Sequence, residues 1–177
     1  MSQMILDVQA FLETGGGVLN FIGIVTIVMW TLMLERFYFF YWVFPQVADE
    51  AQRAWRERSD HSSWGAHQIR RLRVSELRMQ LEDGLAYIRV LVALCPLLGL
   101  LGTVTGMIEV FDVMAVAGSG NAKAMAGGVS KATIPTMAGM VAALSGLILS
   151  ARLEQFASDE GERLADRLEI DHGGEEE

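Results

Sequence analysis

The sequence predicts an all-α integral membrane protein whose three transmembrane helices extend into the cytoplasm. Hydrophobic residues make up 51% of the chain and its mean hydropathy is +0.30, which is high for a soluble domain. Three stretches contain no charged residue: residues 14–34, 90–108 and 132–151, which hold 21, 19 and 20 residues. A helix of about 20 residues crosses a hydrocarbon core of roughly 30 Å. Each stretch is therefore long enough to span a bilayer.

The placement of basic residues predicts the orientation. Seven arginines lie in the predicted cytoplasmic region 45–88 and three follow the third charge-free stretch, whereas the predicted periplasmic loop 117–127 carries only Lys123. Cytoplasmic segments carry the excess of Lys and Arg, so we expect a periplasmic N-terminus and a cytoplasmic C-terminus. The first basic residue is Arg36, so no basic region precedes the first stretch and we expect that helix to be retained.

The N-terminal half divides into three predicted segments. Residues 1–13 form a periplasmic amphipathic segment that ends at the glycine run 15–17, and residues 14–44 form the first transmembrane helix. Its aromatic cluster at 37–42 suits the headgroup level, and Pro45 is the expected break. Residues 45–88 form a cytoplasmic helical region. Its arginine run at 70–73 could bind nucleic acid or anionic lipid, but we interpret it as a solvated helical face.

The C-terminal half contains a predicted transmembrane hairpin. We expect the second transmembrane helix at 89–116, a periplasmic loop at 117–127 and the third transmembrane helix at 128–151. Residues 152–177 form a cytoplasmic helical extension and an acidic tail, because apolar residues recur there at helical spacing before the acidic residues take over.

Small residues line one side of each hairpin helix. They allow backbones to approach closely in lipid, where apolar burial does not drive association. These positions are Gly99, Gly102 and Gly106 in the second helix and Gly139 and Gly146 in the third. Pro96 and Pro135 lie inside the two helices and are candidate kinks.

Two threonines are expected at the same depth. The loop is centred near residue 120, and Thr103 and Thr136 are nearly equidistant from it. In an antiparallel hairpin they form a hydroxyl layer inside the bilayer. Each hydroxyl can donate and accept, so the layer can host water or solvate a partner's protonatable group. The alternative is that each threonine bonds back to a carbonyl of its own helix.

Two opposite charges share a second depth, nearer the outer end. Glu109 and Lys131 are equidistant from the loop centre, and Asp112 is an alternative partner for Lys131. An isolated charge is costly in hydrocarbon, so a structural ion pair and a role in ion conduction both remain open. Lys131 and Thr136 differ by five residues, or about 140° around the helix, so they do not share a narrow face.

Nothing in the chain indicates an enzyme, a cofactor or a metal site. Ser145 lies in the third span, but the three histidines lie outside the spans: His61, His67 and His172. No histidine can therefore activate that serine, and the histidines with the lone Cys95 form no metal-ligand cluster. No phosphate-binding glycine loop is present either.

The hairpin resembles the ExbB/TolQ/MotA proton-channel family, and it looks closest to ExbB of TonB-type energising systems. The resemblance rests on residues 96–106, Pro-Leu-Leu-Gly-Leu-Leu-Gly-Thr-Val-Thr-Gly, and on residues 132–145. It implies a homopentamer in the bacterial inner membrane, whose central pore holds a dimer of single-span ExbD-like helices, with a TonB-like protein receiving the work. Thr103 and Thr136 match the family's pore-facing threonines, which surround the partner's protonatable aspartate.

One position departs from the family. The resemblance calls for a glutamate where this chain has Lys131. The cytoplasmic segment is also short, which argues against a flagellar stator. A TolQ-like subunit for envelope maintenance and a non-conducting membrane scaffold remain as alternatives.

Overall fold

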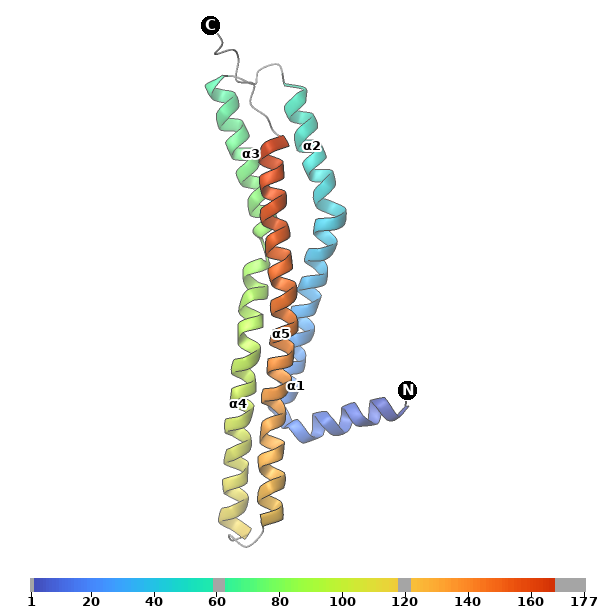
Figure 1. Cartoon of the computed structure of the whole chain (residues 1–177), viewed down its shortest axis with the longest axis vertical. Coiled ribbons are helices and arrows are strands. Elements are labelled where there is room, and N and C mark those ends of the chain that lie inside the picture. Colours follow the sequence, from blue (N-terminus) through green and yellow to red (C-terminus); the bar gives the residue numbers. More distant parts are fainter. Residues whose placement is uncertain (1, 59–62, 118–121, 168–177) are drawn as a thin grey trace. The chain divides into compact units, whose positions relative to one another are not determined.

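The computed structural model describes residues 2–58, 63–117 and 122–167, and all regular elements in these ranges are helical (Figure 1). They are α1 (Ser2–Tyr38), the π-helical turn η1 (Phe39–Val43), α2 (Phe44–Arg56), α3 (Trp64–Glu82), α4 (Leu85–Ala117) and α5 (Ala122–Arg167). Three helical stretches are long and apolar enough to cross a membrane: Gly16–Arg56, Trp64–Ala115 and Ala126–Asp166. The all-helical, multi-pass prediction is confirmed. The predicted acidic tail lies outside the described residues.

The helices pack into two compact units. The first consists of Met1–Thr31 and Tyr87–Ile148, and the second of Leu32–Ala86 and Leu149–Glu177. Each unit is described by itself below.

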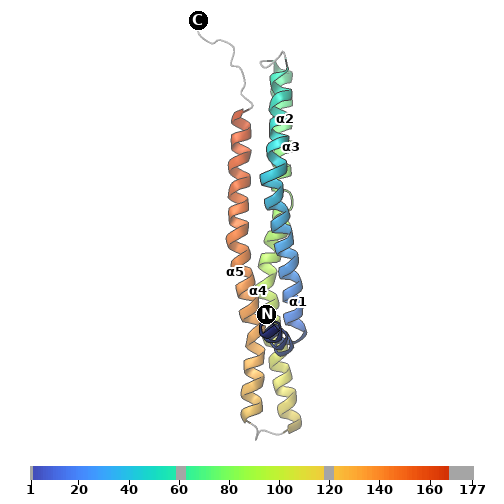
Figure 2. The same ribbon diagram turned by 90° about the vertical axis from the view of Figure 1, so that its right-hand side faces the viewer.

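The first unit packs part of α1 against the hairpin of α4 and α5. Buried residues recur every three or four positions along α1, which gives one apolar stripe. The stripe consists of Leu19, Ile22, Val25 and Met29, and the buried residues of α4 and α5 in this unit include Ile88, Val92, Cys95, Ala132 and Ala142. Helices α4 and α5 run antiparallel and side by side in both views (Figure 2). The opposite faces remain apolar and uncovered within the chain, as expected for surfaces that meet lipid or other helices.

A kink divides α1 within the glycine run. Gly16 has φ 68° and ψ −165°, a conformation that residues with a Cβ rarely adopt. The helix before Gly16 therefore turns away from the part that packs in the first unit (Figure 1). Helical structure is present on both sides of the glycine run. The burial of side chains in the predicted amphipathic segment 1–13 lies outside what the structure describes.

Several helix boundaries differ from the predicted ones. Helix α5 begins at Ala122, within the predicted loop 117–127, because the alanine-rich residues before Gly127 favour a helix. Helix α4 begins at Leu85, directly after Gly84, whose φ of 74° interrupts the helical backbone. The expected break at Pro45 is replaced by continuous helical structure. Pro45 lies in the first turn of α2, directly after η1, and the Phe44 N–H bonds to the Phe39 carbonyl oxygen with the wider spacing of a π-helix.

The second unit combines η1, α2, α3 and the end of α5. Trp55 and Ala66 are buried against each other with Val74, and Ser63 accepts a hydrogen bond from the Ala66 N–H at 3.1 Å, which caps α3. The rings of Phe40 and Phe156 lie 5.3 Å apart. Helix α5 continues without interruption to Arg167, as the apolar spacing after residue 152 predicts.

Candidate functional site

The α4–α5 seam brings two backbones into contact at glycines. A methyl group added to Gly139 would lie 2.5 Å from the carbonyl oxygen of Cys95 and 3.2 Å from the Cα of Gly99. One added to Gly99 would lie 3.0 Å from the Cα of Thr136. Because these neighbours are backbone atoms, neither position has space for a side chain. The glycines therefore set the distance between the two helices.

The other predicted packing glycines also face neighbouring helices. A methyl group at Gly106 would lie 2.6 Å from the Cβ of Ala132, and one at Gly102 would meet the ring of Pro135. At Gly146 the nearest atoms would be the sulfur of Met29 in α1 and a methyl carbon of Val92 in α4, both at 2.7 Å. All five glycines thus lie at helix contacts within the first unit.

Thr103 and Thr136 meet across this seam. Their Oγ1 atoms are 2.6 Å apart, and both side chains are half-buried. The Thr103 hydroxyl lies 3.2 Å from the Gly99 carbonyl oxygen in its own helix. Thr136 instead donates across the seam to that same carbonyl oxygen at 2.8 Å. The back-bonding alternative therefore describes Thr103 in part but not Thr136.

The two threonines lie within charge-free stretches. Thr103 is fourteen residues beyond Arg89, which corresponds to about 21 Å along α4 at 1.5 Å per residue. The described neighbours on the exposed faces are apolar, including Leu100, Val104 and Met140. A polar pair is thus held at the contact between two helices whose exposed neighbours at this depth are largely apolar.

The charged residues of the hairpin also meet. Lys131 Nζ lies 3.6 Å from Glu109 Oε2, and the two side chains remain 43% and 66% exposed. This exposure leaves both charges accessible to water or headgroups, so neither bears the full cost of burial. Asp112, the alternative partner, is exposed one turn further along α4.

The ion pair and the hydroxyl pair lie on opposite edges of the seam. Thr103 and Glu109 differ by six residues, or about 120° around α4, and the seam glycines fall between them. Thr136 and Lys131 are separated by about 140° around α5, again with the seam between them. We call these the threonine edge and the charge edge.

An apolar hollow of about 680 Å³ lies between α4 and α5 on the same side as the threonine edge, and neither threonine lines it. Pro96 and Met140 contribute to its lining. Pro96 lies two turns from Thr103 in α4, and Met140 lies one turn from Thr136 in α5, on the same edge.

Both α4 and α5 continue through Pro96 and Pro135, the two candidate kinks, as single helices. Pro135 is buried in the seam, where its ring packs against Gly102.

Arg36 in the second unit was not selected from the sequence. Its side chain is only 11% exposed, and its Nη2 lies 3.1 Å from Asp83 Oδ2. Its Nη1 approaches the Gln80 carbonyl oxygen at 3.5 Å, and its guanidinium lies 5.6 Å from the centre of the Phe39 ring. Arg36 thus joins the end of α1 to the α3–α4 turn. An arginine among aromatic residues at a helix end also fits a headgroup anchor, so the sequence does not distinguish the two roles.

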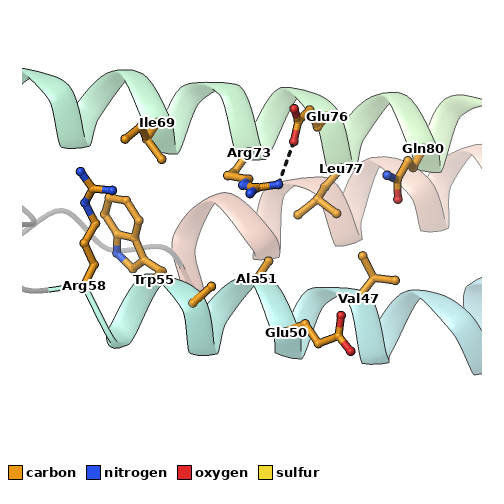
Figure 3. A pocket seen from close by; sticks show the side chains of 11 residues that line it. Val47, Glu50, Ala51, Trp55, Arg58, Ile69, Arg73, Glu76, Leu77 and Gln80 are labelled. Carbon is orange, nitrogen blue, oxygen red and sulfur yellow. Dashed lines mark hydrogen bonds and ion pairs between the residues drawn. The ribbon is translucent and has the colours of Figure 1, made fainter.

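A groove of about 400 Å³ lies between α2 and α3 in the second unit (Figure 3). Its charged lining carries both signs, and Arg73 pairs with Glu76 at 3.2 Å. Arg70 donates to the Ala165 carbonyl oxygen at 2.6 Å. Part of the arginine run therefore takes part in contacts within the unit.

Among the residues that the structure describes, no three His, Cys, Asp or Glu side chains lie together so as to hold a metal ion. His61 and His172 lie outside those residues.

Fold and site together define a multi-pass helical membrane protein with a hydroxyl pair inside a tightly packed hairpin. The model of the MotA/TolQ/ExbB proton channel family matches residues 45–166, which is more than half of the chain. The chain belongs to this family.

Two relatives from Synechocystis sp. are similar to it. The biopolymer transport protein ExbB-like 1 is 40% identical over 86 residues, which cover 47% of this chain and 33% of the relative. ExbB-like 3 is 36% identical over 74 residues, which cover 38% of this chain and 35% of the relative. The matched region thus spans about a third of the length of each relative.

Proposed function

We propose that this chain is the channel subunit of a proton-driven complex in the bacterial inner membrane. A single-span partner helix passes along the threonine edge, and a carboxylic acid on that helix exchanges protons at the depth of Thr103 and Thr136. The N-terminus of this chain is periplasmic and its C-terminus cytoplasmic, in keeping with the distribution of its arginines.

The 2.6 Å contact between the two threonine hydroxyls carries this proposal. A carboxylic acid in hydrocarbon is costly without polar neighbours, and ionisable residues inside membranes therefore lie where such neighbours occur. The hydroxyl pair supplies them, and the apolar hollow that begins one to two turns away on the same side accepts another part of the helix. Family membership supports a proton-channel role.

The resemblance extends the proposal to the complex. Five copies surround a pore that holds a dimer of an ExbD-like protein, and proton flow drives a TonB-like protein that energises outer-membrane transport. The 40% identity to an ExbB-like biopolymer transport protein favours this role over that of a TolQ-like subunit for envelope maintenance.

Proton flux in vesicles that contain this chain and its single-span partner tests the proposal. Replacing both hydroxyls, Thr103→Val with Thr136→Val, is expected to reduce the flux at least about tenfold, because the acid loses its polar neighbours. Thr105→Val is the matched control. The Thr105 hydroxyl bonds only to Leu101 and Gly102 in its own helix, at 3.0 and 3.1 Å, so its loss should leave the flux unchanged.

Unchanged flux in the double variant would reject the threonine pathway. If the unmodified chain and its partner form a complex in the vesicles but the vesicles conduct no protons, the chain is a scaffold and not a channel subunit.

A further inference from the structure

A second groove, of about 300 Å³, lies in the second unit between the end of α1, the turn η1 and helix α5. Most of its lining is apolar or aromatic, and this part consists of Phe37, Phe40, Tyr41, Leu149, Leu153 and Phe156. Gln155 and two opposite charges, Arg152 and Asp159, complete the lining. None of these residues belongs to the threonine edge or to the charge edge.

Three stacked rings form one wall of this groove. The ring centres of Phe37 and Tyr41 are 4.8 Å apart, and those of Tyr41 and Phe156 are 6.2 Å apart with their planes 14° from parallel. Phe40 is buried, and its ring lies 5.3 Å from that of Phe156. Phe37 and Tyr41 remain more than half exposed. The wall is therefore an apolar surface that the described part of the chain leaves uncovered at its outer rings.

The two charges lie at different levels along α5. Arg152 directly follows the charge-free stretch 132–151, and Asp159 lies seven residues further on, about 10.5 Å along the helix. Seven residues make nearly two full turns, so both side chains lie on the same face as Phe156. Both are exposed, and neither takes part in a hydrogen bond or an ion pair within the described residues. A cation thus lies at the edge of the hydrocarbon, and an anion lies further from it.

We propose that this groove binds a phospholipid whose headgroup carries a phosphate and a primary ammonium, as in phosphatidylethanolamine. In such a lipid the acyl chains, the phosphate and the ammonium follow one another outward from the hydrocarbon. The groove offers partners in the same order. Leu149 and the aromatic wall face the start of an acyl chain, Arg152 lies at the level of the phosphate, and Asp159 lies at the level of the ammonium. A guanidinium binds phosphate oxygens through two parallel N–H bonds.

Asp159 determines which headgroup fits. A primary ammonium carries a positive charge and N–H donors for the carboxylate, and the resulting hydrogen bond is charge-assisted. The trimethylammonium of phosphatidylcholine has no N–H, and the glycerol of phosphatidylglycerol has no positive charge. Arg152 can contact the phosphate of all three lipids, so it contributes affinity and not selectivity. A soluble headgroup without acyl chains would leave the aromatic wall uncovered, which favours the intact lipid.

The test places the full chain in phosphatidylcholine nanodiscs with a trace of phosphatidylethanolamine that carries a photoreactive diazirine near the glycerol end of one acyl chain. After illumination, mass spectrometry of the digested chain measures the labelling of residues 149–159. Unlabelled phosphatidylethanolamine, phosphatidylglycerol or soluble glycerophosphoethanolamine serves as the competitor. The variants are Arg152→Gln and Asp159→Asn. Their controls are Arg71→Gln and Glu35→Gln, which make the same charge changes at exposed residues outside the groove.

We expect the label to concentrate on residues 149–159, and phosphatidylethanolamine to compete at a mole fraction about five- to tenfold lower than phosphatidylglycerol, the effect of one charge-assisted hydrogen bond. Arg152→Gln should lower the labelling about five- to tenfold, because the phosphate loses its guanidinium partner. Asp159→Asn should make the two lipids compete equally. The two controls should behave as the unmodified chain, and glycerophosphoethanolamine should not compete. If Arg152→Gln fails to insert as a helical protein, the exposed Asp159→Asn decides alone.

Equal competition by the two lipids in the unmodified chain would overturn the inference, because the groove would then hold ordinary boundary lipid. Labelling that both Arg152→Gln and Asp159→Asn leave unchanged would also contradict it, as would competition by glycerophosphoethanolamine. If illumination instead shows residues 149–159 covered by a second copy of the chain and free of lipid label, the groove is an interface between copies and the lipid site is wrong. None of these outcomes depends on proton flux, so the inference and the proposed function can fail separately.

Discussion

Gly139→Ala is expected to push the two hairpin helices apart. The added methyl group would lie 2.5 Å from the Cys95 carbonyl oxygen, and ordinary contact begins near 3.4 Å, so the backbones must separate by about 0.9 Å. The same displacement would lengthen the 2.6 Å contact between Thr103 and Thr136 to about 3.5 Å, the outer limit of a hydrogen bond. Overpacking of this kind costs about 1 to 3 kcal/mol.

Gly23→Ala is the matched control, because a methyl group there meets nothing within 4 Å. Both variants gain the same helix propensity, about 1 kcal/mol, so the difference between them reports the seam. Unfolding by SDS in mixed micelles, followed by helical circular dichroism, measures each free energy. Gly139→Ala should be less stable than Gly23→Ala by about 1 to 3 kcal/mol. Equal stabilities would show that the seam tolerates the methyl group and that the glycine does not set the helix spacing.

The same unfolding assay tests two ion pairs. Lys131→Glu places two like charges together and should lower the free energy of unfolding by about 1 kcal/mol. Adding Glu109→Lys should recover most of this loss. If the losses of the two single variants simply add in the double variant, the 3.6 Å contact does not stabilise the hairpin. Arg36→Lys should cost about 1 kcal/mol, because one ammonium cannot contact both Asp83 and the Gln80 carbonyl oxygen as the two guanidinium nitrogens do. The exposed Arg71→Lys is its control, and equal losses would show that the Arg36 contacts do not stabilise the second unit.

The sequence predicts the three spans well because each charged residue in hydrocarbon carries its own energetic cost, so a span is visible as a stretch without charges. It predicts the ends of helices less well, because these depend on position within a turn. Pro45 breaks a helix in the interior but is tolerated in the first turn of α2. Gly127 is exposed with nothing within 4 Å, so α5 runs through it at only the small cost of its propensity.

For the candidate site, the sequence predicts the depth of the residues but not the direction of their side chains. Equal distance from the loop predicts that Thr103 and Thr136 share a depth, since helical rise is uniform. It does not predict which way each side chain turns, because Pro135 and the close approach at Gly99 determine the rotation of α5 against α4. The bond from Thr136 to the Gly99 carbonyl oxygen therefore appears only in the structure.

The position of the seam also bears on Lys131, which stands where the family resemblance calls for a glutamate. Lys131 lies on the charge edge, more than a quarter turn around α5 from the threonine edge. The substitution therefore leaves the composition of the proposed proton site unchanged. Glu109 returns a carboxylate to the charge edge from the facing helix, 3.6 Å from Lys131 Nζ. A lysine here pairs with that carboxylate, so the charge edge joins the two helices near the loop, apart from the threonine edge on which the proposed function depends.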